Sequence, residues 1–321
     1  LAGRRLLPHG SLRWKLAMLN CRHLISSHVD QPILRPPEIT RLAEPTYQFT
    51  FLQHGVIKDD LSRWLNDKAL NLFITSTEAE YESIAGDNTP YVYTSKEVKL
   101  TGLPRFDALT AAHRRRGERE PDLLLIAPTW RQWLNQLAPD GSEADERSHA
   151  FEASEYFQNW RDVLTSDRLQ SAAASAGLSV AFLPHPNIRP AVRLFNLDSR
   201  IPVIEYSDPD LHDYFARAAV LITDYSSMAF NAAYLEHPVV YFQFDSERVK
   251  AGGHLGRQGY FEYERDGFGP VAESPEEVFA AVESITTGSL HSKYRDRITN
   301  TFPFRDGKCS ERVIEAIRQL G

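Results

Sequence analysis

The sequence predicts an α/β protein whose strands form parallel sheets. Short apolar runs alternate with longer helical stretches from the start of the chain, as in successive strand–helix–strand units. The length of 321 residues, against roughly 100–200 for one domain, predicts two domains, each with its own core. The expected strands are His23–Ser26, Phe49–Gln53, Leu72–Ile74, Lys99–Leu100, Leu123–Ala127, Val180–Leu183, Val203–Glu205, Val220–Thr223 and Val239–Phe242, and the expected helices include Trp160–Ala176 and Ser227–Leu235.

Composition and charge exclude several classes of protein. With 42% hydrophobic and 25% charged residues, the chain has a globular composition, unlike that of a disordered or collagenous protein. The 36 Lys and Arg residues against 43 Asp and Glu residues give a net charge of −7, which argues against a nucleic-acid partner. Cys21 and Cys309 lie far apart without metal-type spacing, as is typical of a reducing compartment, and we expect a cytoplasmic location.

The N-terminal segment is basic and apolar, but no apolar run approaches the roughly 20 residues of a membrane helix. Leu6–His23 lacks the unbroken apolar centre of a signal peptide. Two interpretations stay open: a surface that meets anionic lipid at the inner face of the membrane, or a helix packed on the first domain. The cations concerned are Arg4, Arg5, Arg13, Lys15 and Arg22. Because the first residue is Leu1 rather than Met, we expect a segment of a longer polypeptide.

A charge-dense stretch, His113–Glu120, precedes Pro121 and the strongest strand. We interpret it as the linker between domains 1–118 and 119–321, with a solvated helix end as the alternative. A second irregular stretch, Pro139–Ser148, is rich in Asp, Glu, Ser and Gly and is expected to be a mobile loop of the second domain.

Four stretches place chemically active residues where a strand gives way to a loop, which is where ligands bind in open parallel sheets. In Phe49–Gly55 (FTFLQHG), a strand delivers Gln53 and His54 to such an edge. A histidine there is suited to take a proton from a hydroxyl, as a general base does. The alternative is a histidine that only hydrogen-bonds the loop backbone.

The second stretch is a buried strand that ends in Pro128, Thr129 and a cation, Arg131 (LLLIAPTWR). We expect Arg131 to clamp phosphate oxygens with two hydrogen bonds and Thr129 to donate a third. Alternatively, Arg131 pairs with a surface acid, and Trp130 and Trp133 are core aromatics.

The third stretch, Val180–Pro186 (VAFLPHP), delivers His185 between two prolines. The prolines fix the backbone and hold the imidazole, whose cationic form would neutralise pyrophosphate oxygens. The alternative is a rigid turn in which the histidine has no chemical role.

The fourth stretch, Val220–Asn231 (VLITDYSSMAFN), is the most informative. A strand runs into Asp224, and Ser226 and Ser227 then open a helix, so that hydroxyls and backbone N–H groups converge at a positive dipole end. This arrangement predicts an anion site, with a plain helix cap as the alternative.

One further turn, in Thr101–Asp107 (TGLPRFD), presents Arg105 and Asp107 after a strand. They are candidates for a site, or they form one structural ion pair. The 11 histidines include no H-E-x-x-H motif, so no tightly bound metal is inferred. A divalent cation such as Mg²⁺ is compatible with the sequence but is not implied by it.

Six motifs occur together in a characteristic order. They are LQHG (Leu52–Gly55), TGLPRFD (Thr101–Asp107), APTWR (Ala127–Arg131), PHP (Pro184–Pro186), TDYSS (Thr223–Ser227) and FRDGKCSERV (Phe304–Val313). From about Phe49 to the C-terminus the chain resembles the CDP-glycerol glycerophosphotransferase family, of the teichoic-acid polymerase type. The resemblance implies a GT-B fold, a pair of Rossmann-type domains facing a central cleft, with the donor in the C-terminal domain. It also implies that the N-terminal, acceptor-side domain is incomplete here and that the last helix crosses back to it.

The same resemblance implies roles for the candidate residues. His54 is the acceptor-side base, and His185 is the second catalytic histidine. The donor pyrophosphate is held by Arg131, Thr129, His185, Ser226, Ser227 and Asp224, and the acceptor side includes Gln53, Arg105 and Asp107.

The implied activity is transfer of a polyol phosphate, above all glycerol phosphate, from CDP-glycerol or CDP-ribitol. The acceptor is a hydroxyl of a glycan or polyol-phosphate chain, often lipid-linked, in teichoic-acid-like or capsule synthesis, and CMP is released without a cofactor. Two alternatives stay open: a nucleotide-sugar glycosyltransferase or epimerase on the same fold, and an inactive nucleotide-binding partner module.

Overall fold

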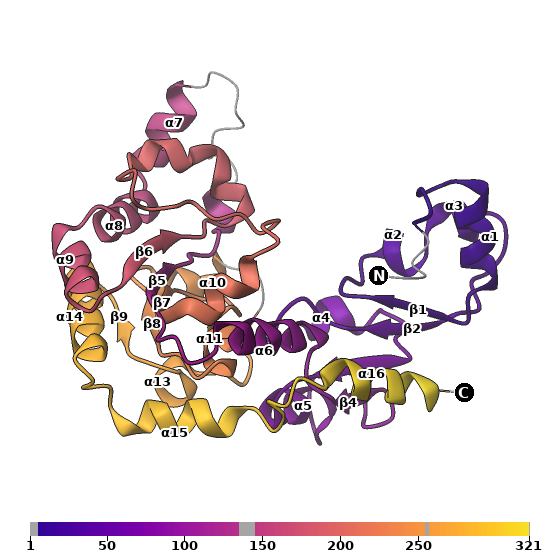
Figure 1. Ribbon diagram of the computed structural model, residues 1–321. Coiled ribbons are helices and arrows are strands. Elements are labelled where there is room, and N and C mark those ends of the chain that lie inside the picture. The colour runs from indigo at the N-terminus through magenta and orange to yellow at the C-terminus, as the bar shows by residue number, and fades with distance from the viewer. Residues whose placement is uncertain (1–5, 135–144, 254–256, 321) are drawn as a thin grey trace. The chain divides into compact units, whose positions relative to one another are not determined.

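The computed structural model describes residues 6–134, 145–253 and 257–320, which form two compact units (Figure 1). Unit 1 comprises Leu1–Val56, Leu61–Pro104 and Lys308–Gly321, and unit 2 comprises Ile57–Asp60 and Arg105–Gly307. The long crossing into unit 2 lies at the start of helix α6 (Pro104–Arg116), whereas the sequence analysis expected it after residue 118. The basic residues His113–Arg116 are the last turn of α6, so this part of the expected linker is a helix end.

Unit 1 contains a parallel sheet of four strands in the order β1-β2-β3-β4. The strands are β1 (His23–Ser26), β2 (Gln48–Phe51), β3 (Leu72–Thr75) and β4 (Val98–Leu100). The helices are α1 (Leu12–Asn20), α2 (Gln31–Leu34), α3 (Pro37–Thr40), α4 (Ser62–Leu65), α5 (Glu78–Ala85) and α16 (Cys309–Arg318). The inner strand β3 is buried along its whole length, as expected of a strand covered on both faces.

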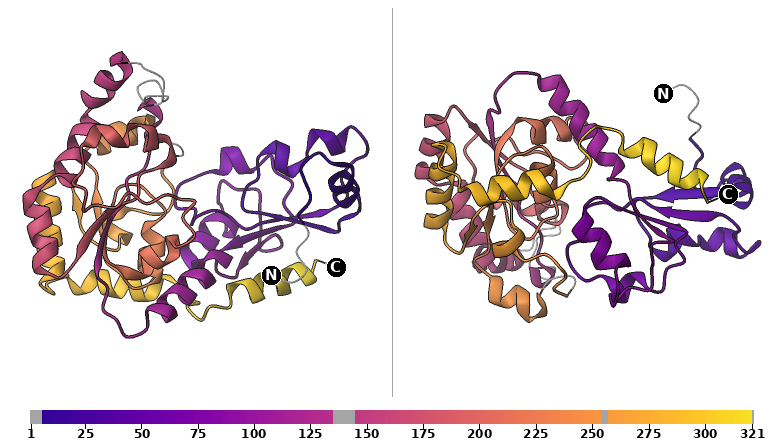
Figure 2. Two further views of the ribbon diagram at one scale, coloured as in Figure 1. Left: turned by 45° about the horizontal axis from the view of Figure 1, so that its top comes forward. Right: turned by 90° about the horizontal axis from the view of Figure 1, so that it is seen from below.

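Helix α16 brings the end of the chain back to unit 1, where both views of Figure 2 show it beside the strands. Its residues Cys309, Val313 and Ile317 are spaced by one helical turn and are buried. Gly102 permits this contact because its φ is +76° and a Cβ there would collide with Cys309 Sγ. The turn that contains Gly102 therefore leaves room for the first residue of α16, Cys309, to pack against it.

Unit 2 contains a parallel sheet of five strands in the order β6-β5-β7-β8-β9. The strands are β5 (Leu123–Ile126), β6 (Ser179–Phe182), β7 (Ala218–Thr223), β8 (Val239–Phe242) and β9 (Val271–Ala272). The helical segments are α6, η1 (Gln132–Leu134), α7 (Asp145–Glu152), α8 (Glu155–Leu164), α9 (Asp167–Ser175), η2 (Pro186–Phe195), α10 (Leu211–Arg217), α11 (Ala229–Tyr234), α12 (Ser246–Arg248), η3 (Val249–Gly253), α13 (Tyr263–Asp266), α14 (Pro275–Thr286) and α15 (Ser292–Thr301).

Helices cover both faces of this second sheet, with α8, α9 and α14 on one face and α10 and α11 on the other (Figure 1). Strands β5 and β8 are buried at every position, as the continuous apolar runs of the sequence predict. Trp160 on α8 is fully buried and packs edge-on against Phe242, with ring centroids 5.1 Å apart. The expected α/β class with parallel sheets is confirmed.

Three expected elements differ in detail, and one strand, β9, was not expected. The helix expected over Trp160–Ala176 is two helices, because Ser166 accepts a hydrogen bond from Leu169 N and starts α9. Val203–Glu205 contributes only an isolated bridge from Val203 to β6. The two-residue strand β9 is too short to show a pattern. Of the expected loop Pro139–Ser148, residues 139–144 lie outside the described residues and the rest begins α7. Within the described ranges, no helix is both long and apolar enough to cross a bilayer.

Candidate functional site

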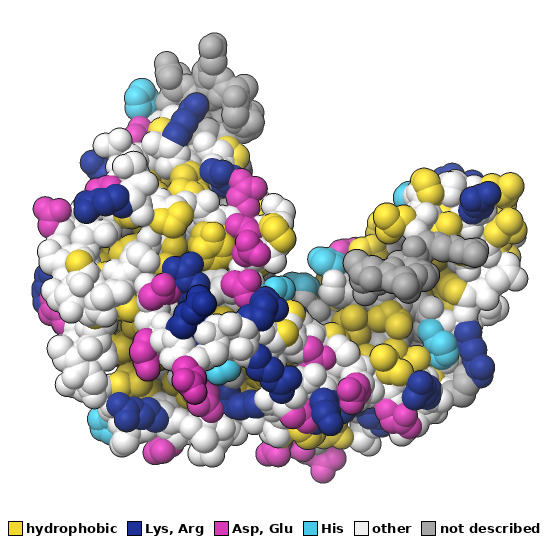
Figure 3. All heavy atoms as spheres, in the orientation of Figure 1, with side chains coloured by type: hydrophobic (Ala, Val, Ile, Leu, Met, Phe, Trp, Pro, Cys, Tyr) yellow, Lys and Arg dark blue, Asp and Glu magenta, His cyan; other side chains and the backbone are white. Residues whose placement is uncertain are grey.

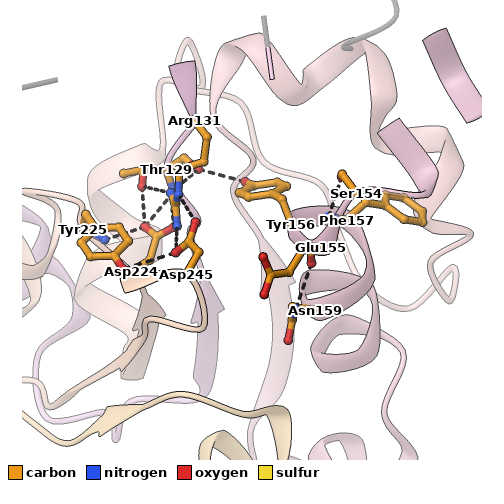
Figure 4. Close-up of polar contacts among 10 residues, drawn as sticks. All are labelled: Thr129, Arg131, Ser154, Glu155, Tyr156, Phe157, Asn159, Asp224, Tyr225 and Asp245. Atoms are coloured by element: carbon orange, nitrogen blue, oxygen red, sulfur yellow. Dashed lines mark hydrogen bonds and ion pairs between the residues drawn. The ribbon is translucent and has the colours of Figure 1, made fainter. Parts of the chain in front are cut away.

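Three strand-end loops of unit 2 meet at a buried arginine, Arg131, which follows β5. Its Nη1 donates to Asp224 Oδ2 at 2.8 Å, and its Nε and Nη2 donate to the two carboxylate oxygens of Asp245 at 2.7 and 3.1 Å. Asp224 follows β7 and Asp245 follows β8. Figure 4 shows the guanidinium between the two carboxylates. All three side chains are at most 1% exposed.

Neighbouring groups add further hydrogen bonds to this network. Asp224 Oδ1 accepts from Thr129 N and Oγ1, at 2.9 and 2.6 Å, and from Tyr225 N at 2.8 Å. The Tyr225 hydroxyl donates to Asp245 at 3.2 Å, and the Tyr156 hydroxyl donates to the Thr129 carbonyl at 2.9 Å. Every buried oxygen of Asp224 is thereby satisfied, as a low-dielectric interior requires.

The electrostatics keep Arg131 charged. Burial alone would lower its pKa, but the negative charges of Asp224 and Asp245 raise the pKa well above its usual range. Burial, followed by the charge of Asp245, raises the pKa of Tyr225, so this hydroxyl keeps its proton and remains a donor.

Arg131, Thr129 and Asp224, expected to hold the donor pyrophosphate, bond one another in this structure. The guanidinium is 0% exposed and turned toward two buried carboxylates, so this geometry does not support a direct clamp on phosphate. The alternative prediction, that Arg131 pairs with a surface acid, also differs from the structure, because Asp224 and Asp245 are buried. What the network does is tie the β5, β7 and β8 loops together. Sequence reasoning missed Asp245, Tyr225 and Tyr156, although FQFD after β8 resembles the other strand ends.

The two serines follow directly on this network. Ser226 and Ser227 are half-buried, and Ser226 Oγ accepts from Met228 N at 3.1 Å. Helix α11 begins at Ala229, two residues later than expected, because the Ser226 and Ser227 carbonyls first accept from Ala229 N and Phe230 N in a turn. The serines thus lie at the carboxyl edge of the sheet, at the end of the central strand β7.

His185 caps η2 at the same edge, after β6. Its Nδ1 accepts from Asn187 N at 3.2 Å, so the ring proton of the neutral form is on Nε2. The ring lies 6.2 Å from that of Tyr206, whose hydroxyl contacts Met228 Sδ at 3.6 Å. Met228 directly follows Ser226 and Ser227, and this segment, 226–228, is here called the serine loop. Tyr206, which sequence reasoning missed, therefore links His185 to the serine loop. Burial and the charge of Asp224 raise the pKa of Tyr206 to about 12.

Arg105 and Asp107 belong to unit 2 and not to the N-terminal, acceptor-side unit expected for them. Burial lowers the pKa of Arg105, and the nearby Tyr206 opposes this. Burial and then the Arg105 charge lower the pKa of His212. Arg105 is therefore a cation in the neighbourhood of Tyr206 and His212 of the same unit.

In unit 1, Gln53 and His54 follow the strand β2, which ends at Phe51. Gln53 has φ +61°, is 4% exposed and donates from Nε2 to the Ile74 carbonyl at 2.5 Å, so its side chain is directed into the unit. His54 is exposed, and its ring stacks on His28 with centroids 5.2 Å apart and planes 14° apart. Its Nδ1 lies 3.3 Å from the Ser27 carbonyl, which leaves Nε2 as the basic nitrogen. Sequence reasoning missed His28, which precedes this edge in a separate loop.

Among the residues that the structure describes, no three His, Cys, Asp or Glu side chains are grouped to hold an ion.

The chain is similar to proteins of teichoic-acid synthesis. It is 30% identical over 323 residues to the minor teichoic acid biosynthesis protein GgaB of Bacillus subtilis strain 168, covering 98% of this chain and 34% of that protein. It is 24% identical over 233 residues to the teichoic acid glycerol-phosphate transferase of Staphylococcus aureus, covering 68% and 53%. The chain thus spans about a third of one relative and half of the other.

A solved structure of the wall teichoic acid polymerase TagF superposes with a TM-score of 0.63 at 17% identity, covering 93% of this chain and 72% of that one. This likeness confirms the fold class, an α/β pair of Rossmann-type units of the GT-B kind. A family model for CDP-Glycerol:Poly(glycerophosphate) glycerophosphotransferase matches residues 2–319, and the chain belongs to that family.

Proposed function

We propose that the chain transfers a polyol phosphate, glycerol phosphate first, from a CDP-activated donor to a hydroxyl of a glycan or polyol-phosphate acceptor. The product is a phosphodiester in a teichoic-acid-like or capsule polymer, and CMP is released. Membership of the glycerophosphotransferase family supports the reaction class. A relative at 30% identity that is named for minor teichoic acid biosynthesis supports the kind of polymer.

The observation that carries this proposal is the carboxyl edge of the unit 2 sheet. His185 follows β6, and Ser226 and Ser227 follow β7, the two strands on either side of β5. This carboxyl edge is where ligands bind in open α/β sheets. His185 Nε2 and the serine hydroxyls are hydrogen-bond donors, which suits the oxygens of a diphosphate. The buried Arg131 network below them keeps the serine loop in place before a donor arrives, which is how preorganised sites stabilise charge.

The proposed step is an in-line displacement at the distal phosphorus of the donor. The acceptor oxygen forms a bond to this phosphorus, and the bond to the bridging oxygen breaks, so that CMP leaves with the electron pair. The acceptor proton passes to His54 Nε2, and His185 and the two serines bind the charge on the departing CMP. The reaction consumes no redox cofactor, and we assign no metal to it.

Incubation of the chain with CDP-glycerol and a primed acceptor is expected to release CMP. CDP should also raise the melting temperature more than UDP, because a ligand stabilises the state that it binds. CDP-ribitol serves as the second donor, and EDTA as a check for a required divalent cation. Equal or better protection by UDP would favour a nucleotide-sugar enzyme. Protection by CDP with no CMP from either donor would favour an inactive binding module.

We also propose that unit 1 attaches peripherally to the cytoplasmic face of a membrane, where a lipid-linked acceptor would be met. Leu6, Leu12 and Leu16 are 95%, 73% and 52% exposed, beside the basic residues Arg13 and Lys15. Figure 3 shows apolar and basic side chains together over the α1 and α3 region. The cations Arg4 and Arg5 lie outside the described residues. An apolar and basic surface of this kind suits the interface of anionic lipid.

The chain is therefore expected to float with vesicles that contain anionic lipid. Leu12→Asp with Leu16→Asp should reduce the bound fraction at least about tenfold, because burial of a leucine is worth roughly 1.5–3 kcal/mol. Val92→Asp is the matched control, since Val92 is 62% exposed elsewhere in unit 1. Sedimentation of the wild type away from both anionic and neutral vesicles would end the proposal.

A further inference from the structure

A second histidine, His28, lies on the ring of His54 at the same edge of the unit 1 sheet. Strands β1 and β2 are parallel neighbours, and Ser26, the last residue of β1, pairs with Phe51, the last residue of β2. Leu52 N donates to the Ser26 carbonyl at 2.8 Å, which carries this pairing one residue further. The loops that follow the two strands therefore start side by side. One of them carries His28 and the other carries His54.

The backbone around His28 is held on both sides of this residue. On one side, His28 N donates to Ser26 Oγ at 3.0 Å, and the Ser27 hydroxyl lies 3.0 Å from His28 Nδ1. On the other side, Val29 is 0% exposed, so the next residue is anchored in the core of the unit. The exposed imidazole of His28 is therefore carried by a fixed loop.

This loop contacts His54 in two ways. The Ser27 carbonyl lies 3.3 Å from His54 Nδ1, and the His28 ring is stacked on the His54 ring, with planes 14° apart and centroids 5.2 Å apart. The carbonyl accepts a hydrogen bond only when Nδ1 carries the proton, so this contact selects the tautomer whose lone pair is on Nε2. Nearly parallel rings at this separation attract each other, so the second contact orients the ring plane.

We propose that His28 is a positioning residue, which holds the His54 ring so that Nε2 can take the acceptor proton in the transfer proposed above, on which this inference rests. One hydrogen bond at the ring edge fixes a distance, whereas a stacked ring also fixes the tilt of the imidazole. A base with the wrong tilt slows proton transfer. Donor binding is not weakened, because the proposed phosphate ligands belong to unit 2. A phenyl ring would also stack, so the role belongs to the flat ring of His28.

Two substitutions separate the ring of His28 from its hydrogen bond. His28→Phe keeps a flat ring over His54 and loses the contact with the Ser27 hydroxyl, whereas His28→Asn keeps a polar partner for this hydroxyl and loses the ring. His28→Asn should lower kcat about 3- to 10-fold, the factor that one stacked aromatic pair is worth, with the donor KM and the CDP affinity within about twofold of wild type. His28→Phe should keep kcat within about twofold of wild type.

His291→Ala is the matched control. His291 is also exposed, its Nδ1 is also hydrogen-bonded, to Lys293 N at 3.1 Å, and its ring also meets an aromatic ring, that of Tyr294, with centroids 6.4 Å apart. It belongs to unit 2 and has no place in the proposed reaction. Its replacement should leave kcat within about twofold of wild type, as is usual for a surface substitution.

A readout without turnover separates this inference from the proposed function. The ring nitrogen and ring proton resonances of His54, assigned by their loss in His54→Gln, report its tautomer and its stacking. They should move toward the values of an unstacked histidine in His28→Asn, and they should keep the stacked values in His28→Phe and in His291→Ala. If the wild type releases no CMP, the proposed function fails, and these resonances still decide whether His28 holds the ring.

Three results would overturn the inference. The first is a wild-type kcat in His28→Asn, and the second is a set of unchanged His54 resonances in that variant. The third is a loss of kcat in His28→Phe as large as in His28→Asn, because the effect would then belong to the hydrogen bond with Ser27 and not to the stacked ring.

Discussion

Replacement of His54 by alanine is expected to lower the rate of transfer by about 10²–10⁴-fold, the usual loss when a general base is removed. The affinity for CDP should stay within about twofold of wild type, because the proposed phosphate ligands are in unit 2 and His54 is in unit 1. Single-turnover CMP release and calorimetric titration with CDP measure the two quantities separately.

Two neighbouring histidines serve as controls for this prediction. His28→Ala removes the ring stacked on His54 but leaves the contact of His54 Nδ1 with the Ser27 carbonyl, so the loss should be smaller. His185→Ala should weaken CDP binding as well as slow turnover. If His54→Ala keeps the wild-type rate, the base is elsewhere, and Asp107 and Asp224 are the next carboxylates to replace.

The strands that position these residues were predictable from the sequence for a simple reason. A strand in the middle of a parallel sheet is buried on both faces, so Leu123–Ile126 and Val239–Phe242 read as continuous apolar runs. The residues just after such runs lie at the ligand-binding edge, which is how His54, His185 and Ser226 were found. The two-residue β9 and the isolated bridge at Val203 carry too few residues for any such pattern.

The partners of a side chain were not predictable in the same way. The acids around Arg131 are 93 and 114 residues away in the sequence, so APTWR reveals a cation without showing that two carboxylates enclose it. The surroundings of Arg105 were not predictable either. Its motif predicts a turn, but whether that turn belongs to unit 1 or unit 2 depends on where α6 packs, and Phe106 stacks on Tyr234 of unit 2 at 4.3 Å.

Replacement of Arg131 by methionine is expected to destabilise the protein by about 3–5 kcal/mol, because it leaves two carboxylates buried without a counter-charge. The loss should appear as a lower midpoint in urea and in thermal unfolding. Arg168→Ala, which breaks an ion pair about half exposed on each side, should cost no more than about 1 kcal/mol.

The Arg131→Met variant also tests which role Arg131 has. Either it holds the β5, β7 and β8 loops together, or it binds phosphate directly. If Arg131 acts by neutralising Asp224 and Asp245, then Arg131→Met combined with Asp224→Asn and Asp245→Asn should regain part of the lost stability, because no buried charge remains. Part of the CDP affinity should return with it, since Tyr225 and Thr129 can still hydrogen-bond the amides and hold the serine loop. A direct ligand would behave differently, because its loss would remove CDP affinity in the single and the triple variant alike. Recovery of stability without any recovery of CDP binding would therefore return Arg131 to the role of a phosphate clamp.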